Sequence, residues 1–271
     1  MFDAIIRAGV EPLAMDDLYR YTDLETRIQS VTHALGVILV AFALGSIVLP
    51  ILLLVFLDPF VPLVDGESYT SEGYLLLSSV QFMGFIIVAI GYVNWRDVDL
   101  FEFSIPSLRG LAWIPGGFVL LYAVAYGLSV LIGLLNLDIA TNSVVEIGRQ
   151  DPQIFLYMIP ISFLLVGPGE ELVFRGVVQG LFRKAYGVVP AVLLASVFFG
   201  ISHYLALAGE GRVTYIAIAM GLGLVLGTVY ERTENIVVPA VIHGAWNAML
   251  FASEWYAATN PEMAESLILL P

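Results

Sequence analysis

The chain of 271 residues is 59% hydrophobic and 13% charged, with a mean hydropathy of +0.89, values that exclude an ordinary soluble domain. Its 24 acidic and 11 basic residues give a formal net charge of −13, so it lacks the basic surface that nucleic-acid binding requires. It has no cysteine, which excludes disulfides, S-acylation and thiolate metal ligands. We therefore predict a polytopic protein of the lipid bilayer.

The first thirty residues mix acids and bases and have no long apolar core after a basic region. We therefore predict no cleaved signal peptide, and we expect the first span to act as its own insertion signal. Residues 1–30 are interpreted as a cytoplasmic or interfacial segment.

Seven runs reach or approach the roughly 20 apolar residues that a helix needs to cross a bilayer. They lie at 31–57, 75–93, 111–135, 153–169 and beyond, 187–207, 213–230 and 236–252. An eighth span would require the chain to re-enter near its C-terminus. We predict an all-α fold, with one transmembrane domain over 31–252 and a short tail at 253–271.

The basic residues predict the orientation, because cytoplasmic loops hold an excess of Lys and Arg. With the N-terminus inside, the inner side carries Arg7, Arg20, Arg27, Arg96, Arg109, Arg175, Arg183, Lys184 and Arg232, and the outer side only Arg149 and Arg212. Arg175 counts only if it lies near the inner surface. We predict a multi-pass cell-membrane protein with a cytoplasmic N-terminus.

The span at 213–230 contains Gly223 and Gly227 at a spacing that allows two membrane helices to approach closely. We interpret these glycines as packing residues.

The stretch "PGEELVFRG" places charge directly after a strongly apolar run. Ionisable groups at membrane depth cost about 2.5–3.5 kcal/mol each and usually face the bundle interior. Glu171 and Arg175 are four residues apart and can pair on one helix face, whereas Glu170 points about 100° away. An unpaired carboxylate in a poorly hydrated site suits a general base. Alternatively, both acids cap a new helix that starts after Gly169.

His203 follows the motif "FFGIS" late in the span at 187–207, and Phe199 lies one turn before it on the same face. His243 and Asn247 share one face of the last span and supply two donors that could stabilise an oxyanion. Each of these patterns is also compatible with simple helix packing. His33, at the start of the first span, is expected to be interfacial and is left out of the site.

These groups lie on three hydrophobic helices in the second half of the chain. If the fourth helix continues past a kink at Pro168 to Arg183, Glu170 and His203 lie at similar depth, with His243 somewhat shallower. A converged site would hold a base, two imidazoles and an amide, enough to activate water.

The motifs "EELVFR", "FFGISH" and "HGAWN" resemble EExxxR, FxxxH and HxxxN of the CPBP family, which includes type II CAAX prenyl endopeptidases and proteins of bacteriocin maturation or self-immunity. The resemblance covers about residues 150–252 and implies an intramembrane glutamate protease that needs no metal cofactor. It implies that Glu170 is the base and that His203 helps to hold the water. His243 and Asn247 would form the oxyanion hole, with Glu171 and Arg175 in supporting roles.

A substrate with a hydrophobic or lipid-modified C-terminus is the expected partner, and in eukaryotic members it is a prenylated CAAX protein. Two alternatives stay open: a zinc protease that uses Glu170, His203 and His243 as ligands, and a non-catalytic immunity or scaffold protein. A transporter is also conceivable, although the first half of the chain has no matching broken helix.

Overall fold

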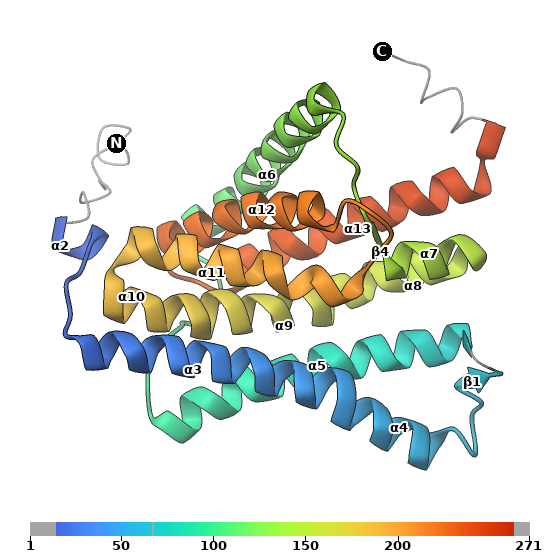
Figure 1. The fold of residues 1–271 in the computed structure, drawn as a ribbon, viewed down its shortest axis with the longest axis horizontal. Coiled ribbons are helices and arrows are strands. Elements are labelled where there is room, and N and C mark those ends of the chain that lie inside the picture. Colours follow the sequence, from blue (N-terminus) through green and yellow to red (C-terminus); the bar gives the residue numbers. More distant parts are fainter. Residues whose placement is uncertain (1–14, 67, 263–271) are drawn as a thin grey trace.

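The computed structural model describes residues 15–66 and 68–262, and in this part of the chain helices dominate. Six helices are long and apolar enough to cross a membrane: Leu24–Leu57, Ser71–Arg96, Leu108–Leu135, Gln153–Tyr186, Val188–Ala206 and Arg212–Thr233. A seventh, α13 (Val237–Thr259), runs alongside them but is less apolar, since His243 and Asn247 interrupt it (Figure 1). The predicted all-α membrane bundle is confirmed. The suggested eighth span lies outside the described residues.

The first spanning helix is preceded by the short α2 (Met15–Leu18) and comprises α3 (Leu24–Ala43), η1 (Leu44–Val48) and α4 (Leu49–Leu57). It begins seven residues before the expected position 31, because Asp23 caps it by accepting the Thr26 backbone N–H at 2.8 Å. This hydrogen bond lowers the pKa of the Asp23 carboxyl below its usual range. His33 on this helix bonds Tyr92 Oη at 2.7 Å and thereby ties it to α5 (Ser71–Arg96).

Two small antiparallel strand pairs close the loops at one end of the bundle. β1 (Val64–Asp65) pairs with β2 (Ser68–Tyr69) between the first two spanning helices. β3 (Thr141–Asn142) follows α6 (Leu108–Leu135) and pairs with β4 (Leu207–Ala208). The second pair therefore holds the loop after α6 against the loop after the fifth spanning helix, next to the short α7 (Ser143–Gln150).

The fourth spanning helix is continuous through the Gly-Pro-Gly sequence, as predicted. Its segments are α8 (Gln153–Ile161), η2 (Ser162–Val166), α9 (Gly167–Glu171), η3 (Leu172–Gln179) and α10 (Gly180–Tyr186), with π-helical turns at η2 and η3. Pro168 has no N–H to donate, and the wider turn directly before it accommodates the missing bond. The alternative in which the acids cap a new helix is wrong, because no helix starts at Gly169.

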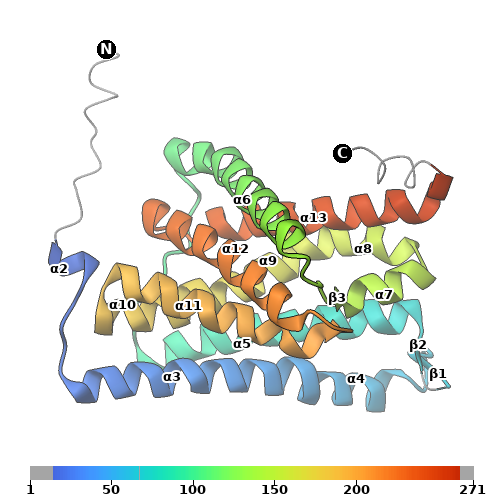
Figure 2. The same cartoon turned by 45° about the horizontal axis from the view of Figure 1, so that its top comes forward.

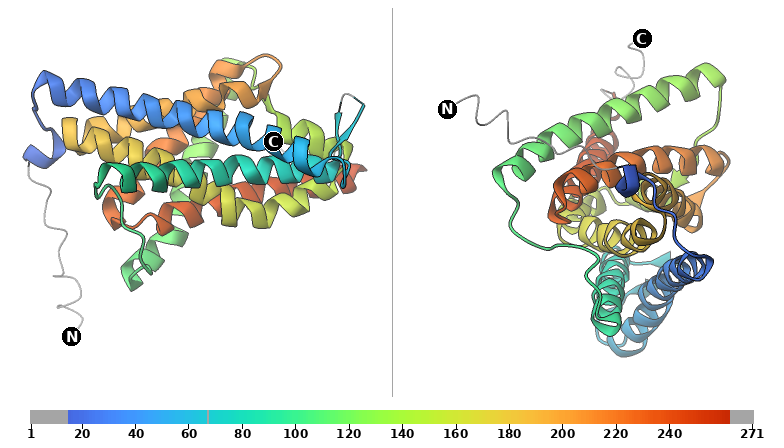
Figure 3. Two further views of the ribbon diagram at one scale, coloured as in Figure 1. Left: turned by 90° about the horizontal axis from the view of Figure 1, so that it is seen from below. Right: turned by 90° about the vertical axis from the view of Figure 1, so that its left-hand side faces the viewer.

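The long fourth helix lies at the centre of the bundle. α3 and α5 pack on one side of it, and α11 (Val188–Ser202), α12 (Arg212–Thr233) and α13 pack around the other, as the end-on view in Figure 3 shows. α6 crosses the outside of α12 and α13 (Figure 2). Every residue of η3 is buried. Large apolar side chains are exposed on the outer helices, as a lipid-facing surface requires.

Candidate active site

The site forms where the fourth helix crosses α13 at very short range, and two glycines make this approach possible. A Cβ atom on Gly167 would lie 2.5 Å from the Ala240 carbonyl oxygen, and one on Gly244 would lie 3.0 Å from the Ser162 carbonyl oxygen. Any side chain at these positions would push the helices apart. The crossing brings the acids that follow Gly167 next to the polar residues that flank Gly244.

Glu171 contacts both other members of a buried polar cluster, Arg175 and His243. Its Oε1 accepts a hydrogen bond from Arg175 Nη1 at 3.0 Å and lies 2.8 Å from His243 Nδ1. Glu171 is 0% and Arg175 1% exposed, so the predicted ion pair on one helix face exists and is fully desolvated. Since the carboxylate accepts, His243 donates through Nδ1, which leaves its Nε2 for other partners. Because Arg175 is buried inside the bundle, it does not count among the basic residues that indicate the orientation in the membrane.

Glu170 lies near the other nitrogen of the same His243 ring. Its Oε2 lies 3.7 Å from His243 Nε2 and has no hydrogen-bond partner, although the atom is buried. The side chain is 14% exposed and lines a cavity. An unsatisfied carboxylate oxygen beside a cavity is a position where a water molecule can bind.

His203 is the first residue of the 3₁₀ turn η4 (His203–Ala206), directly after α11 ends, and not part of a continuing α-helix. Its Nδ1 donates to the Phe199 carbonyl oxygen at 2.8 Å, so in the neutral ring Nε2 is an acceptor. The Phe199 ring packs edge-on against His203 at 4.8 Å between ring centroids. The same ring lies 4.2 Å from the Arg175 guanidinium carbon and 5.8 Å from the His243 ring. The Phe199 ring therefore packs against the Arg175 guanidinium and both cavity histidines.

One cavity of about 940 Å³ contains Glu170, His203, His243 and Asn247 in its lining. The three helices thus converge on one cavity, with Asn247 one turn beyond His243 on α13. The remaining lining side chains are both apolar and polar. They come from α3, η1, α5, α7, the fourth helix, α12, α13 and the loops beside them. A cavity with both kinds of group can enclose a mostly apolar ligand and orient it through polar contacts.

The polar contacts continue from Arg175 along the fourth helix. Arg175 Nη2 donates to the Gly223 carbonyl oxygen at 3.2 Å, and one turn later Gln179 Nε2 donates to the Gly227 carbonyl oxygen at 3.2 Å. Gln179 also bonds Glu231 at 2.8 Å. The two glycines therefore pack closely, as predicted, and in addition expose backbone carbonyls to the buried donors. The sequence analysis overlooked Gln179, although its spacing of four from Arg175 was a readable signal.

Two further cavity residues were also overlooked. Asn142 of β3 and Tyr215 of α12 line the cavity, with Asn142 Nδ2 3.5 Å from Tyr215 Oη. The Tyr215 ring centroid lies 6.0 Å from that of His203. Asn142 is far from the motifs in sequence and reaches the site through the pairing of β3 with β4. No local sequence pattern therefore predicted that it lines the cavity.

Among residues 15–66 and 68–262, no group of three or more His, Asp or Glu side chains is arranged to hold a metal ion. The zinc alternative needs Glu170, His203 and His243 to ligate together. Loss of activity on treatment with a zinc chelator would support this alternative.

The fold and the site together describe a polytopic membrane protein with a polar cavity inside its helical bundle. The family model described as "Type II CAAX prenyl endopeptidase Rce1-like" matches residues 152–249, the segment that contains all the motif residues. The match confirms the resemblance indicated by the motifs and supports a membrane-embedded peptidase. No curated protein and no solved structure matches the chain.

Proposed function

We propose that the protein is a glutamate-dependent intramembrane endopeptidase that cleaves a peptide bond near a hydrophobic or lipid-modified, CAAX-like C-terminus. The observation that carries the proposal is the unpartnered Glu170 carboxylate oxygen at a cavity that also contains His203, His243 and Asn247. The family match over 152–249 supports the same activity.

In this proposal Glu170 is the general base. A water bound between Glu170 Oε2 and His203 Nε2 transfers a proton to Glu170 while its oxygen attacks the scissile carbonyl carbon. The hydrogen bond from His203 Nδ1 to Phe199 supports this geometry, since it leaves Nε2 free to accept from the water. As the C–N bond breaks, Glu170 returns the proton to the leaving amine, so charge and protons balance.

Asn247 and His243 stabilise the oxyanion of the tetrahedral intermediate. Asn247 contributes its amide N–H, and His243 contributes Nε2, because its Nδ1 is engaged by Glu171. In this role Nε2 carries a hydrogen, and the Glu170 and Glu171 carboxylates lie 3.7 Å and 2.8 Å from the two ring nitrogens. Glu171 and Arg175 are positioning residues, which hold the His243 ring at the cavity wall.

We further propose that the N-terminus is cytoplasmic. Basic residues of the described chain gather at one end of the bundle, namely Arg20, Arg27, Arg96, Arg109, Arg183, Lys184 and Arg232, against Arg149 and Arg212 at the other. The excess supports placing the end where α3 begins in the cytoplasm.

A purified preparation tests the enzymatic proposal most directly. Wild-type protein in detergent should cleave a fluorogenic farnesylated CAAX peptide, and Glu170→Ala should not. Cleavage that persists in Glu170→Ala would contradict the general-base role. No cleavage by wild type on this peptide or on acyl-modified analogues would favour the non-catalytic immunity or scaffold alternative.

A further inference from the structure

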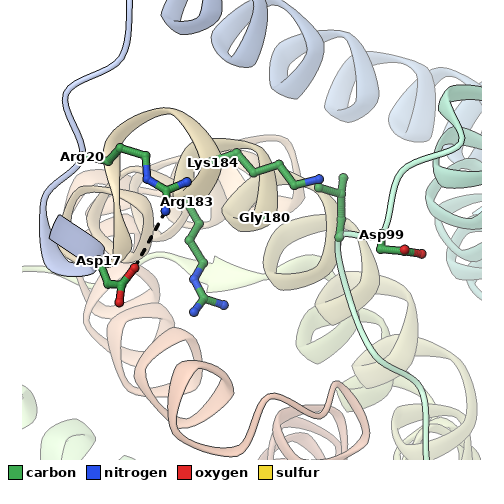
Figure 4. Close-up of a pocket in the computed structure, with 7 residues that line it drawn as sticks. Asp17, Arg20, Asp99, Gly180, Arg183 and Lys184 are labelled. Atoms are coloured by element: carbon green, nitrogen blue, oxygen red, sulfur yellow. Dashed lines mark ion pairs between the residues drawn. The ribbon is translucent and has the colours of Figure 1, made fainter. Parts of the chain in front are cut away.

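A second, smaller pocket of about 250 Å³ lies apart from the candidate active site and is lined mainly by charged side chains (Figure 4). Two of its cations are already paired, with Arg20 Nη2 3.8 Å from Asp17 Oδ1 and Arg183 Nε 3.3 Å from Glu231 Oε2. No residue lines both this pocket and the large cavity. The polar groups available to a substrate in the large cavity are therefore those of its own wall.

Asn142 on β3 and Tyr215 on α12 are two polar residues of this wall that the proposed mechanism does not use. Their segments are far apart in the sequence and meet where α12 begins. There Gly211, with a positive φ of 79°, packs so closely against the Asp138 carbonyl oxygen that a Cβ atom would collide with it. The pairing of β3 with β4 also fixes this loop. The fold itself thus holds Asn142 next to Tyr215.

The hydrogen bonds of Asn142 determine how its side chain is oriented. Its Oδ1 accepts the Val144 backbone N–H at 3.2 Å and thereby caps α7. Because a backbone N–H can only donate, the amide oxygen must face it and the NH₂ group must face the other way. Nδ2 accordingly lies 3.5 Å from Tyr215 Oη, and in this contact Nδ2 is the donor.

The Tyr215 hydroxyl therefore keeps its own hydrogen for another partner. The O–H bond of a phenol lies near the ring plane in one of two directions, and the hydrogens on Asn142 Nδ2 oppose one of them. In the part of the chain that the structure describes, this hydroxyl has no other hydrogen-bond partner. Tyr215 lines the cavity beside His203, with 6.0 Å between the ring centroids. The acceptor for its hydrogen must come from what enters the cavity.

We propose that the Tyr215 hydroxyl donates a hydrogen bond to a backbone carbonyl oxygen of the substrate next to the scissile bond, and that Asn142 is the positioning residue that directs it. The inference rests on the proposed endopeptidase function. In that function the scissile carbonyl has its donors, His243 and Asn247, on α13, so Tyr215 on α12 takes a different carbonyl. A second fixed point on the peptide holds the scissile carbon in place for attack by water.

Tyr215→Phe removes the hydroxyl and keeps the ring. KM for the farnesylated CAAX peptide should rise about tenfold, the loss of one hydrogen bond of about 1.4 kcal/mol. The value of kcat should stay near that of wild type, because the bond is equally strong in the ground state and the transition state. Tyr126→Phe, at an exposed tyrosine of α6, is the control and should match wild type. A wild-type KM in Tyr215→Phe would overturn the proposal.

Asn142→Asp changes the direction of the hydroxyl without removing it. The carboxylate still accepts the Val144 N–H, so the helix cap and the thermal midpoint should persist. Its second oxygen is an acceptor where the amide had a donor, so it should take the Tyr215 hydrogen and withdraw it from the cavity. KM should again rise about tenfold, with no further rise in the double variant with Tyr215→Phe.

Asn94→Asp, at an exposed position on α5, is the control for the added charge and should behave like wild type. A wild-type KM in Asn142→Asp, or effects that multiply in the double variant, would contradict the positioning role of Asn142.

Modified peptides test the contact itself. In each of them one amide beside the scissile bond is replaced by a trans-alkene, which keeps the shape but lacks the carbonyl oxygen. Binding is measured in the Glu170→Gln background, so that it is separated from cleavage. One such peptide should bind about tenfold more weakly than its parent, and adding Tyr215→Phe should not weaken its binding further. If Tyr215→Phe weakens the binding of every peptide alike, the hydroxyl does not hold a carbonyl.

The two measurements distinguish failure of this inference from failure of the proposed function. Cleavage by wild type without the expected binding pattern would refute the Tyr215 contact and leave the endopeptidase function intact. The binding pattern without any cleavage by wild type would support the contact and contradict the function. Absence of binding to every variant would overturn both.

Discussion

His243 Nδ1 and Glu171 Oε1 lie 2.8 Å apart, and this contact joins the last helix of the bundle to the long fourth helix. It fixes the rotation of the His243 ring, so that Nε2 points toward Glu170. Each carboxylate of the adjacent pair keeps one buried oxygen without a hydrogen-bond partner, but Glu171 uses its other oxygen for Arg175 and His243, and only Glu170 lines the cavity. The distinct environments of Glu170 and Glu171 are the physical basis for assigning them different roles.

Glu170→Gln should abolish peptide cleavage and leave folding intact. Glutamine keeps the size and one acceptor oxygen but cannot take a proton, so the rate should fall at least by the roughly 10²–10⁴-fold that general-base catalysis contributes. The measurement is single-turnover cleavage by purified protein, with thermal unfolding in detergent recorded beside it. Glu210→Gln, at an exposed acid, is the matched control and should retain wild-type rates; a wild-type rate in Glu170→Gln would refute the assignment.

Asn247→Ala should lower kcat by about 10²–10³-fold, the usual loss when one oxyanion donor is removed. KM should change little, because the interaction is stronger in the transition state than with the substrate. Ser253→Ala on the same helix is the control, since Ser253 lines the cavity but bonds only the Leu250 carbonyl oxygen. Equal effects of the two substitutions would remove Asn247 from the oxyanion hole.

Arg175→Ala should destabilise the protein by about 3–5 kcal/mol, because it leaves the Glu171 carboxylate buried without its cation. The thermal midpoint in detergent and the yield should both fall. Arg175→Lys is the informative companion. An ammonium group cannot reproduce the planar arrangement that reaches both Glu171 and the Gly223 carbonyl oxygen, so we expect only partial recovery. Wild-type stability of Arg175→Ala would show that the ion pair contributes nothing to the free energy of unfolding.

The sequence predicted the features that depend on local spacing. Runs of apolar residues located the spanning helices, and the four-residue spacing of Glu171 and Arg175 predicted their ion pair. The same spacing rule implied that Glu170 faces another direction. These inferences succeeded because helix geometry alone relates the residues involved.

Contacts between distant segments could not be obtained in this way. The engagement of His243 by Glu171 depends on the close crossing at Gly167 and Gly244, which no periodicity reveals. The contribution of Asn142 depends on the pairing of β3 with β4.

A zinc chelator discriminates between the two protease mechanisms. If Glu170 activates water without a metal, cleavage should be unchanged after prolonged treatment with 1,10-phenanthroline and dialysis. Metal analysis of the active preparation should find zinc well below one equivalent. Inactivation by the chelator, followed by recovery on adding zinc, would instead establish Glu170, His203 and His243 as candidate ligands.

Gly223→Ala should reduce stability and turnover together, although it adds only one methyl group. The new Cβ would lie 3.3 Å from Arg175 Nη2 and 3.2 Å from Phe199 and Ser196 side-chain atoms, so the guanidinium must move from the Gly223 carbonyl oxygen. A displaced Arg175 side chain would weaken its ion pair with Glu171. The Glu171 contact that orients the His243 ring would then weaken as well. Gly127→Ala on α6 is the matched control, because nothing lies within 4 Å of its Cβ position. There alanine should be neutral or stabilise by about 0.5–1 kcal/mol through its higher helix propensity. If Gly223→Ala behaves like this control in both thermal unfolding and kcat, the packing of α12 against Arg175 does not position the active site.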